Sequence, residues 1–323
     1  MNPNRRDFLA LGVGALAVAT LPRALRRPER LVRRQVPVMG TVAEIAVRHP
    51  DEAWAQRAMD AAFAELRRVD VTMSRFRADS DVGRTNRAAG REAVAVCEDT
   101  AEVLAASLGW ARASDGRFDP CLGRVAELWH VGSRAAPPSD AELQLVGRGG
   151  HFRELEVERT GSVPRVLLHA PDAAVDLGGI GKGYGVDLAA QALRDAGVFH
   201  ALVNVGGDLV AMGTDARGEP WKVGVRSPDH LEDVVEVLHV SDRAVATSGD
   251  YLQYFQHGGR RYHHLMDPLT GEPRVTTMRS LTIEATTCMD ADAAATALFG
   301  ADAATRDNVL RRGAQGARVV HSV

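Results

Sequence analysis

The chain has 323 residues, a net charge of −3, and a composition that is 45% hydrophobic and 25% charged. These values are typical of a soluble globular protein, and the length suffices for one large domain with a sizeable buried core. The slightly negative charge gives no indication of a nucleic-acid partner. The cysteines lie far apart without a CxxC pair, which disfavours a zinc site or a disulfide framework but leaves one disulfide open for an exported protein: Cys97, Cys121 and Cys288.

The first thirty residues differ from the rest. Arg5 and Arg6 precede an apolar stretch from Phe8 to Leu21. Its roughly 14 residues are too few to span a bilayer, which takes about 20. We interpret residues 1–30 as a twin-arginine export leader, with an amphipathic N-terminal segment as the alternative. No clear cleavage site follows, so an uncleaved leader that keeps the protein at the membrane stays open.

Apolar periodicity predicts the elements of the first half of the chain. Alternation indicates a strand over 42–47, and helical spacing indicates a helix over 51–73. The polar, glycine-containing stretch 74–90 is expected to be a loop, and a second helix is expected over 99–114. Clusters of proline and glycine make 134–150 a linker or surface excursion.

The second half mixes short strands with two long helices in no regular order. Helices are expected over 182–196 and over 290–312, the latter broken near Gly300. Gly258-Gly259 predicts a hairpin turn. The irregular mixture favours an α+β fold with mixed or antiparallel sheets over a doubly wound sheet. The expected strands are 165–169, 201–205, 221–225, 234–240, 251–256, 261–264, 280–285 and 317–321.

The run from Asp176 to Gly185 contains five glycines directly before an expected helix. Glycines let a backbone approach a ligand closely, and the free N–H groups at a helix start attract phosphate. Lys182 adds a positive charge for the same anion. The spacing matches neither the P-loop nor the dinucleotide motif, so a tight strand-to-helix turn is the alternative.

A second glycine-containing segment, Asn204-Val205-Gly206-Gly207-Asp208, ends an expected strand. The favoured interpretation is a turn in which Asp208 caps a backbone donor. The alternative is a loop against which a flat ligand lies.

The stretch from Tyr262 to Pro273 is dense in groups able to bind ligands or transfer protons. His264 titrates near neutral pH, although a single histidine is more often structural. Because side chains alternate in direction along a strand, His263 and His264 are expected to face opposite sides, one toward a pocket and one toward solvent.

A fourth segment, Cys288 to Thr296, is expected to open a helix. Asp292 and Thr296 lie four residues apart and therefore on one helix face. A carboxylate and a hydroxyl in this arrangement suit a hard cation such as magnesium. Helix capping by Asp290 or Asp292 is the alternative, and the pattern alone favours it.

Taken together, these segments resemble the ApbE-type FAD:protein FMN transferases, from Met39-Gly40-Thr41 to at least Phe299. Ser74-Arg75-Phe76 and Gly116-Arg117-Phe118-Asp119-Pro120 agree in the same order. The resemblance implies a single domain of two intimate lobes over 31–323. It also implies the reaction: FAD is the donor, FMN is attached through a phosphoester to a threonine hydroxyl of a target protein, and AMP leaves. The implied cation is magnesium, with calcium as the alternative.

The resemblance also implies roles for individual residues. The metal ligands would be Asp292, Thr296 and the main-chain carbonyl of Gly179. Asp176 and Lys182 would contact FAD. Proton transfer falls to His264 or Asp292, which the sequence does not rank. The flavin or adenine pocket would be lined by Met39, Phe76, Phe118, Asp119, Pro120 and Leu265.

The chain departs from the family pattern at three positions. Phe76 stands where tyrosine is common, Cys121 where threonine is usual, and Gly179 where other residues are frequent. None of these changes removes a group proposed for the chemistry. Two other functions stay open: hydrolysis of FAD to FMN and AMP, and FAD binding by an exported protein without catalysis.

Overall fold

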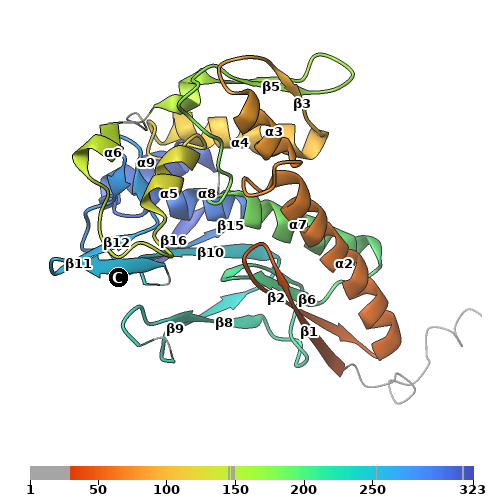
Figure 1. Cartoon of the computed structure of the whole chain (residues 1–323). Coiled ribbons are helices and arrows are strands. Elements are labelled where there is room, and N and C mark those ends of the chain that lie inside the picture. The colour runs from red at the N-terminus through yellow and green to blue at the C-terminus, as the bar shows by residue number, and fades with distance from the viewer. Residues whose placement is uncertain (1–29, 145, 147–149, 231, 252, 315) are drawn as a thin grey trace, which may run out of the picture.

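The computed structural model describes residues 30–144, 146, 150–230, 232–251, 253–314 and 316–323. The predicted leader lies outside this range, apart from Arg30. At the centre is a seven-stranded sheet in the order β1-β2-β6-β7-β10-β15-β16, and every neighbouring pair is antiparallel (Figure 1). Its strands are β1 (Arg30–Val38), β2 (Thr41–His49), β6 (Ala201–Val205), β7 (Asp208–Met212), β10 (Arg243–Gly249), β15 (Ser280–Ala285) and β16 (Arg318–Ser322).

Helices cover one face of this sheet (Figure 1). Side chains alternate along each strand, so Val210 and Met212 of β7 join the core beneath the helices, whereas Leu209 and Ala211 face the other way. The helices on this face, or packed on its helices, are α2 (Glu52–Met73), α4 (Glu98–Ala113), α7 (Gly181–Asp195), α8 (Cys288–Leu298) and α9 (Ala303–Gly313).

The opposite face of the sheet is covered in part by a hairpin of β8 (Trp221–Arg226) and β9 (Val234–Val240). Trp221 and Val240 pack with Leu209 in a small separate core, and the indole N–H of Trp221 donates to the carbonyl of Met212 at 2.9 Å. The apolar alternation of β8 and the buried tryptophan therefore fix this hairpin beneath the sheet.

The remaining elements include a three-stranded sheet in the order β3-β5-β4 and two small hairpins, β11–β12 and β13–β14. The three-stranded sheet lies at the helical side of the molecule, whereas β11–β12 lies beside one end of the large sheet (Figure 1). The main core is continuous from the large sheet into α4, β4 and β5, so the seven-stranded and the three-stranded sheet share one buried interior. The bounds are α3 (Asp81–Ala88), β3 (Val94–Ala95), α5 (Gly123–Trp129), α6 (Asp140–Gln144), a 3₁₀ turn (His151–Glu154), β4 (Leu155–Glu158), β5 (Arg165–Leu168), β11 (Tyr254–His257), β12 (Arg260–His263), β13 (Met266–Asp267) and β14 (Glu272–Pro273).

The structure confirms the α+β fold and most of the expected elements. The turn at Gly258 and Gly259 has φ values of 57° and 78° and joins β11 to β12. Gly300, with φ at 74°, separates α8 from α9 where the break was expected. The three cysteines are free, so the disulfide left open by the sequence does not form. No helix in the described ranges has the length and apolar character needed to cross a membrane.

The prediction of a loop over 74–90 was wrong, because it contains α3. Ser80 is the N-cap, and its hydroxyl accepts a hydrogen bond from Gly83 N–H at 2.8 Å. Gly83 belongs to the helix: a Cβ there would lie against the carbonyl of Arg77, 3.0 Å from its carbon. The glycine therefore marks close packing, not a loop. The expected linker likewise contains the short helix α6.

Candidate active site

The glycine-rich run leads directly into α7 and brings its start against the start of α8. A Cβ on Gly183 would lie 2.6 Å from the carbonyl carbon of Cys288 and 2.8 Å from Cα of Met289. A Cβ on Gly179 would lie 2.9 Å from the hydroxyl oxygen of Thr296. Only glycine permits such close approach of the two backbones. The run therefore lies along the α8 face that carries Thr296.

The first residues of α8 are held from two sides. Thr287 is the N-cap and accepts from Asp290 N–H at 3.1 Å. Asp187 of α7 accepts the N–H groups of Cys288 at 2.8 Å and Met289 at 2.9 Å. Burial raises the pKa of Asp187 to about 6 despite these two hydrogen bonds. Because Thr287 and Asp187 accept the N–H groups at the start of α8, the interpretation of Asp292 as a cap of this helix was wrong.

Asp292 instead points toward the start of α7. Its Oδ2 accepts from Gly183 N–H at 3.1 Å and lies 3.6 Å from Nζ of Lys182. Asp292 is 4% exposed. Burial and the neighbouring carboxylate of Asp208 raise the pKa of Asp292 to about 7, against the lowering effect of Lys182. The structure thus brings together Lys182 and Asp292, two residues that the sequence singled out separately.

Asp208 is the residue of this centre that the sequence interpretation missed. Its carboxylate is buried and forms an ion pair with Lys182 Nζ. Burial opposes the charge of Lys182, but the two carboxylates raise its pKa above the ordinary value. The turn was predicted correctly, but Asn204 caps it, accepting from Gly207 N–H at 2.9 Å. An acid after two glycines was the only available signal for the role of Asp208.

Three oxygen donors fit a hard divalent cation at this place. Asp292 offers a buried carboxylate, Thr296 a hydroxyl one turn further along α8, and Gly179 a carbonyl on the segment that touches Thr296. Magnesium and calcium take oxygen ligands of these kinds. Among the described residues no group of three or more His, Cys, Asp or Glu side chains is arranged to hold a metal. Of the three predicted metal ligands, only Asp292 belongs to those residue types.

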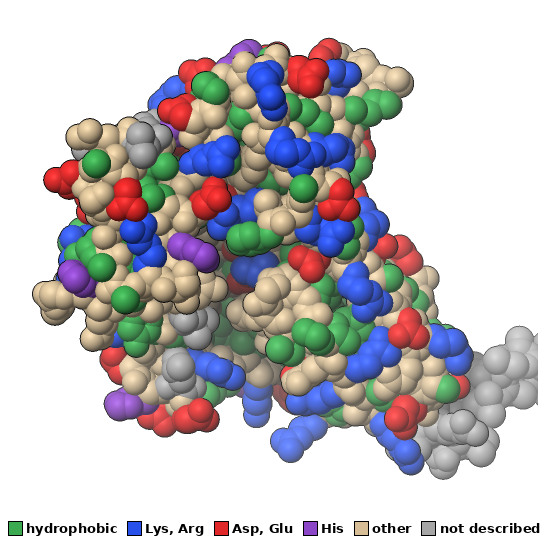
Figure 2. Space-filling view, viewed as in Figure 1, with side chains coloured by type: hydrophobic (Ala, Val, Ile, Leu, Met, Phe, Trp, Pro, Cys, Tyr) green, Lys and Arg blue, Asp and Glu red, His purple; other side chains and the backbone are tan. Residues whose placement is uncertain are grey.

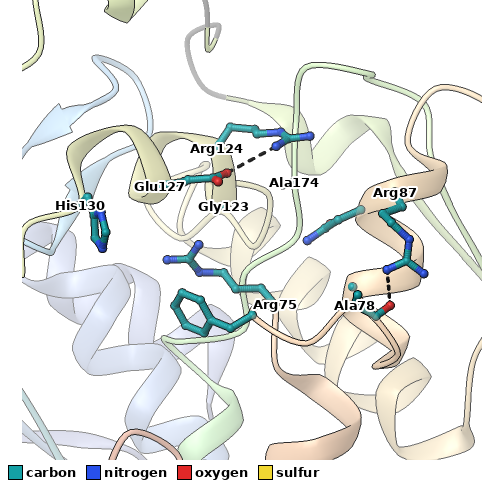
Figure 3. Close-up of a pocket in the computed structure, with 11 residues that line it drawn as sticks. Arg75, Ala78, Arg87, Gly123, Arg124, Glu127, His130 and Ala174 are labelled. Carbon is teal, nitrogen blue, oxygen red and sulfur yellow. Dashed lines mark hydrogen bonds and ion pairs between the residues drawn. The ribbon is translucent and has the colours of Figure 1, made fainter.

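A cavity of about 550 Å³ lies beside the first residues of the glycine-rich run (Figure 3). Asn86 of its lining fixes Val175 through two hydrogen bonds of 2.9 and 2.6 Å. Arg75 forms an ion pair of 3.0 Å with Asp176, which also accepts from Gly178 N–H at 2.8 Å. The cavity wall is therefore tied directly to the segment that precedes Lys182.

The cavity is both aromatic and positively charged. Phe76 is 82% exposed in its wall, with the Arg75 guanidinium 4.1 Å from the ring centre. Figure 3 shows Arg75 and His130 pointing toward one another across the opening. Arg87 and Arg124 add to the lining, where Arg124 pairs with Glu127 at 3.4 Å. Figure 2 shows basic side chains, with a few acidic ones, around the hollow on this face. Such a cavity suits a planar ligand that carries negative charge.

Four other residues predicted to line the ligand pocket are not part of the lining of this cavity. Phe118 and Leu265 are buried in the main core, 3% and 7% exposed. Asp119 accepts from Cys121 N–H at 2.8 Å and Phe152 N–H at 3.4 Å, and burial raises its pKa. The carbonyl of Pro120 accepts from the N–H of Asp176 at 2.7 Å.

Met39 occupies the tight turn between β1 and β2 with φ at 54°. Its N–H donates to Asp70 of α2 at 3.2 Å, and its side chain packs on α7 at Gly185. Met39 therefore joins the sheet edge to the helix that carries Lys182.

The two neighbouring histidines face different environments, as expected. His264 is exposed at the surface. Partial desolvation by the surrounding protein and the charge of Lys182 lower its pKa, whereas the Gln253 carbonyl and Asp176 raise it. His263 is buried, and its Nε2–H donates to the carbonyl of Arg274 at 3.0 Å. Burial lowers the pKa of His263 to about 4. The buried histidine is thus structural, while His264 lies within electrostatic range of Lys182 and Asp176.

Fold and site define a mixed α+β protein in which a half-buried lysine pairs with two buried carboxylates, and in which a cationic cavity is tied to the same glycine-rich segment. A sequence model of the ApbE family matches residues 39–320. An FAD:protein FMN transferase of Vibrio cholerae is 32% identical over 290 residues, covering 88% of this chain and 86% of the relative. That of Treponema pallidum is 34% identical over 277 residues, covering 81% and 76%. The solved ApbE protein of Thermotoga maritima has a TM-score of 0.79 at 30% identity, covering 90% of this chain and 94% of that chain. The chain belongs to the ApbE family, which confirms the resemblance noted from the sequence.

Proposed function

We propose that this protein is a magnesium-dependent FAD:protein FMN transferase that moves FMN from FAD to a threonine hydroxyl of a target protein. The observation that carries the proposal is the meeting of Lys182 with Asp292 and of Gly179 with Thr296. The same glycine-rich segment is tied through Asp176 to Arg75 in the wall of the aromatic, cationic cavity. Further support comes from the FAD:protein FMN transferase of Vibrio cholerae, which is 32% identical over most of both chains.

The reaction exchanges the phosphoanhydride bond of FAD for a phosphoester bond to the threonine oxygen. The threonine oxygen forms a bond to the phosphorus of FMN, and the bond from that phosphorus to the bridging oxygen breaks. The bridging oxygen leaves with AMP. The proton of the threonine hydroxyl passes to His264 or Asp292, both of which interact with Lys182.

Each part of the site has a task in this scheme. Asp292, Thr296 and the Gly179 carbonyl would hold magnesium, with calcium as the alternative. When bound, the cation supplies positive charge to the phosphate oxygens. Lys182 supplies a second positive charge, which Asp208 and Asp292 keep in place. Phe76 and Arg75 offer a face on which the planar part of FAD stacks.

The test uses the purified protein with FAD, magnesium and a protein extract of its source organism. Covalent flavin is detected by fluorescence in a denaturing gel, the modified residue by peptide mass spectrometry, and AMP by chromatography. The Asp292→Ala variant should lose transfer and AMP release. Asp290→Asn is the matched control, because this carboxylate binds Thr287 and the Trp110 indole instead. Full activity of the Asp292→Ala variant would refute the proposed site.

The same assay separates the two other functions. Release of AMP and FMN without an acceptor protein would identify an FAD pyrophosphatase. Tight FAD binding without AMP release under any magnesium concentration would identify a non-catalytic flavin-binding protein. A flavin linked to a residue other than threonine would correct the acceptor while keeping the reaction.

We also propose export through the twin-arginine route, which is supported by Arg5, Arg6 and the apolar stretch that follows them. Replacement of both arginines by lysine should leave the protein inside the cell. Fractionation of cells expressing each form measures this, and it also shows whether the exported protein stays with the membrane. Equal export of both forms would refute the route.

A further inference from the structure

Arg274 is a buried arginine whose hydrogen bonds join main-chain carbonyls from three separate segments. The residue is 7% exposed. Burial and the charge of Arg117 lower its pKa to about 9, so the guanidinium remains protonated at neutral pH. Its side-chain donors reach the carbonyl oxygens of Met266 (3.1 Å), Thr296 (2.8 Å), Ala297 (3.3 Å), Phe299 (2.7 Å) and Arg117 (2.5 Å).

Each of the three segments carries part of the candidate site. Thr296 is a proposed metal ligand near the C-terminal end of α8. Met266 directly follows His264 and Leu265, and the Arg274 N–H also donates to the Leu265 carbonyl at 3.0 Å. The third segment runs from Arg117 to Pro120, whose carbonyl holds Asp176. One side chain therefore connects the end of α8 that carries Thr296 with the segment next to His264 and with the segment that holds Asp176.

The surroundings of Arg274 distinguish this role from simple helix capping. A positive charge is favoured at a helix C-terminus, and Arg117 already supplies one. Its Nε donates to Ala297 at 3.2 Å and its Nη2 to Phe299 at 3.3 Å. Arg274 also reaches the carbonyls of Thr296 and Met266, to which no bond from the Arg117 side chain is found among the described residues. Burying a guanidinium is costly, and an apolar side chain would fill the space without that cost.

We propose that Arg274 is a positioning residue that holds Thr296 in register with the His264–Met266 segment and the Arg117–Pro120 segment. This inference rests on the proposed function, since it assigns a reason for the geometry of that site. The planar guanidinium donates in several fixed directions at once, which suits the bridging of carbonyls that belong to different segments. Loss of the bridge lets the last turn of α8 shift, so the Thr296 hydroxyl moves relative to Asp292 and the Gly179 carbonyl.

The experiment compares Arg274→Lys and Arg274→Met with Arg117→Met. Lysine keeps the charge but loses the fork of donors, whereas Arg117→Met removes charge from the same helix end without breaking the bridge. Direct binding of Mn²⁺, a spectroscopic substitute for the cation, is titrated without FAD. The kcat, the KM for FAD and the melting temperature are measured separately.

We expect both Arg274 variants to bind Mn²⁺ about 10-fold more weakly and to lose about 10- to 100-fold in kcat, in the range found when partners of metal ligands are removed. Arg274→Lys should melt close to the wild type, and the KM for FAD should change by less than the kcat. Arg117→Met should melt at a lower temperature and bind Mn²⁺ as the wild type does.

Wild-type Mn²⁺ affinity in a folded Arg274 variant would overturn the proposal. So would a loss of binding that merely follows the fraction of unfolded protein, because that marks a structural role alone. Equal weakening in Arg117→Met would show that charge at the helix end, not the bridge, is responsible. Absence of flavin transfer by the wild type would refute the proposed function alone, since the Mn²⁺ titration needs no FAD.

Discussion

Replacement of Gly183 by alanine tests the contact between α7 and α8 on which the site depends. The added Cβ would lie 2.6 Å from the carbonyl carbon of Cys288, 0.8 Å closer than ordinary contact begins at 3.4 Å. The obstacle is helix backbone, which moves only as a unit. The two helix starts must therefore separate, and the bond from Gly183 N–H to Asp292 lengthens with them.

The expected effect combines stability and activity. Overpacking costs about 1–3 kcal/mol, of which the better helix propensity of alanine offsets up to about 1 kcal/mol. A displacement of about 1 Å between groups of an active site lowers the rate about 100-fold. We therefore expect a melting temperature a few degrees lower and a loss of about two orders of magnitude in flavin transfer.

Gly109→Ala is the matched control. Gly109 is exposed within α4, and nothing lies within 4 Å of an added Cβ. The same substitution should raise stability there by about 0.5–1 kcal/mol and leave activity unchanged. Calorimetry and the gel assay for covalent flavin measure both variants. A Gly183→Ala protein with wild-type activity and melting temperature would refute the argument that this backbone contact sets the site geometry.

Three further substitutions test other parts of the structure. Asp208→Asn leaves Lys182 with one carboxylate partner and should lower the free energy of unfolding by about 2 kcal/mol, less than the ~3–5 kcal/mol for breaking an isolated buried pair; an unchanged urea midpoint would contradict the ion pair. The pKa of His263 is lowered from 6.5 to about 4, so the folded state binds fewer protons than the unfolded state between these pH values. The free energy of unfolding should therefore fall by about 3 kcal/mol as the pH drops from 6.5 to 4. The His263→Gln variant should lose less stability than the wild type over that interval, as measured by urea unfolding at both pH values. Equal losses of stability in the two proteins would exclude His263 as the cause. Ser80→Ala removes the cap of α3 and should cost about 1 kcal/mol; calorimetry showing no change would mean that the bond to Gly83 contributes nothing.

The order of the site segments, and most elements that carry them, could be predicted from local patterns. Helical spacing gave α2 and α4, the paired glycines gave the β11–β12 turn, and Gly300 gave the break after α8. These signals are local because a helix or a hairpin satisfies its own backbone hydrogen bonds within a short stretch. The family resemblance then connected Asp292, Thr296 and Gly179 in one site.

Tertiary structure alone decided how these segments meet. Asp208 lies 26 positions from Lys182 and Arg274 lies 22 from Thr296, and no periodicity links such pairs. Gly83 resembled a loop residue because its close packing on the Arg77 carbonyl, six residues earlier, depends on how the chain turns before α3 and leaves no periodic pattern. A buried charge is tolerated only where distant backbone and side-chain groups surround it. The sequence therefore determined which residues could take part, and long-range packing determined which of them share one site.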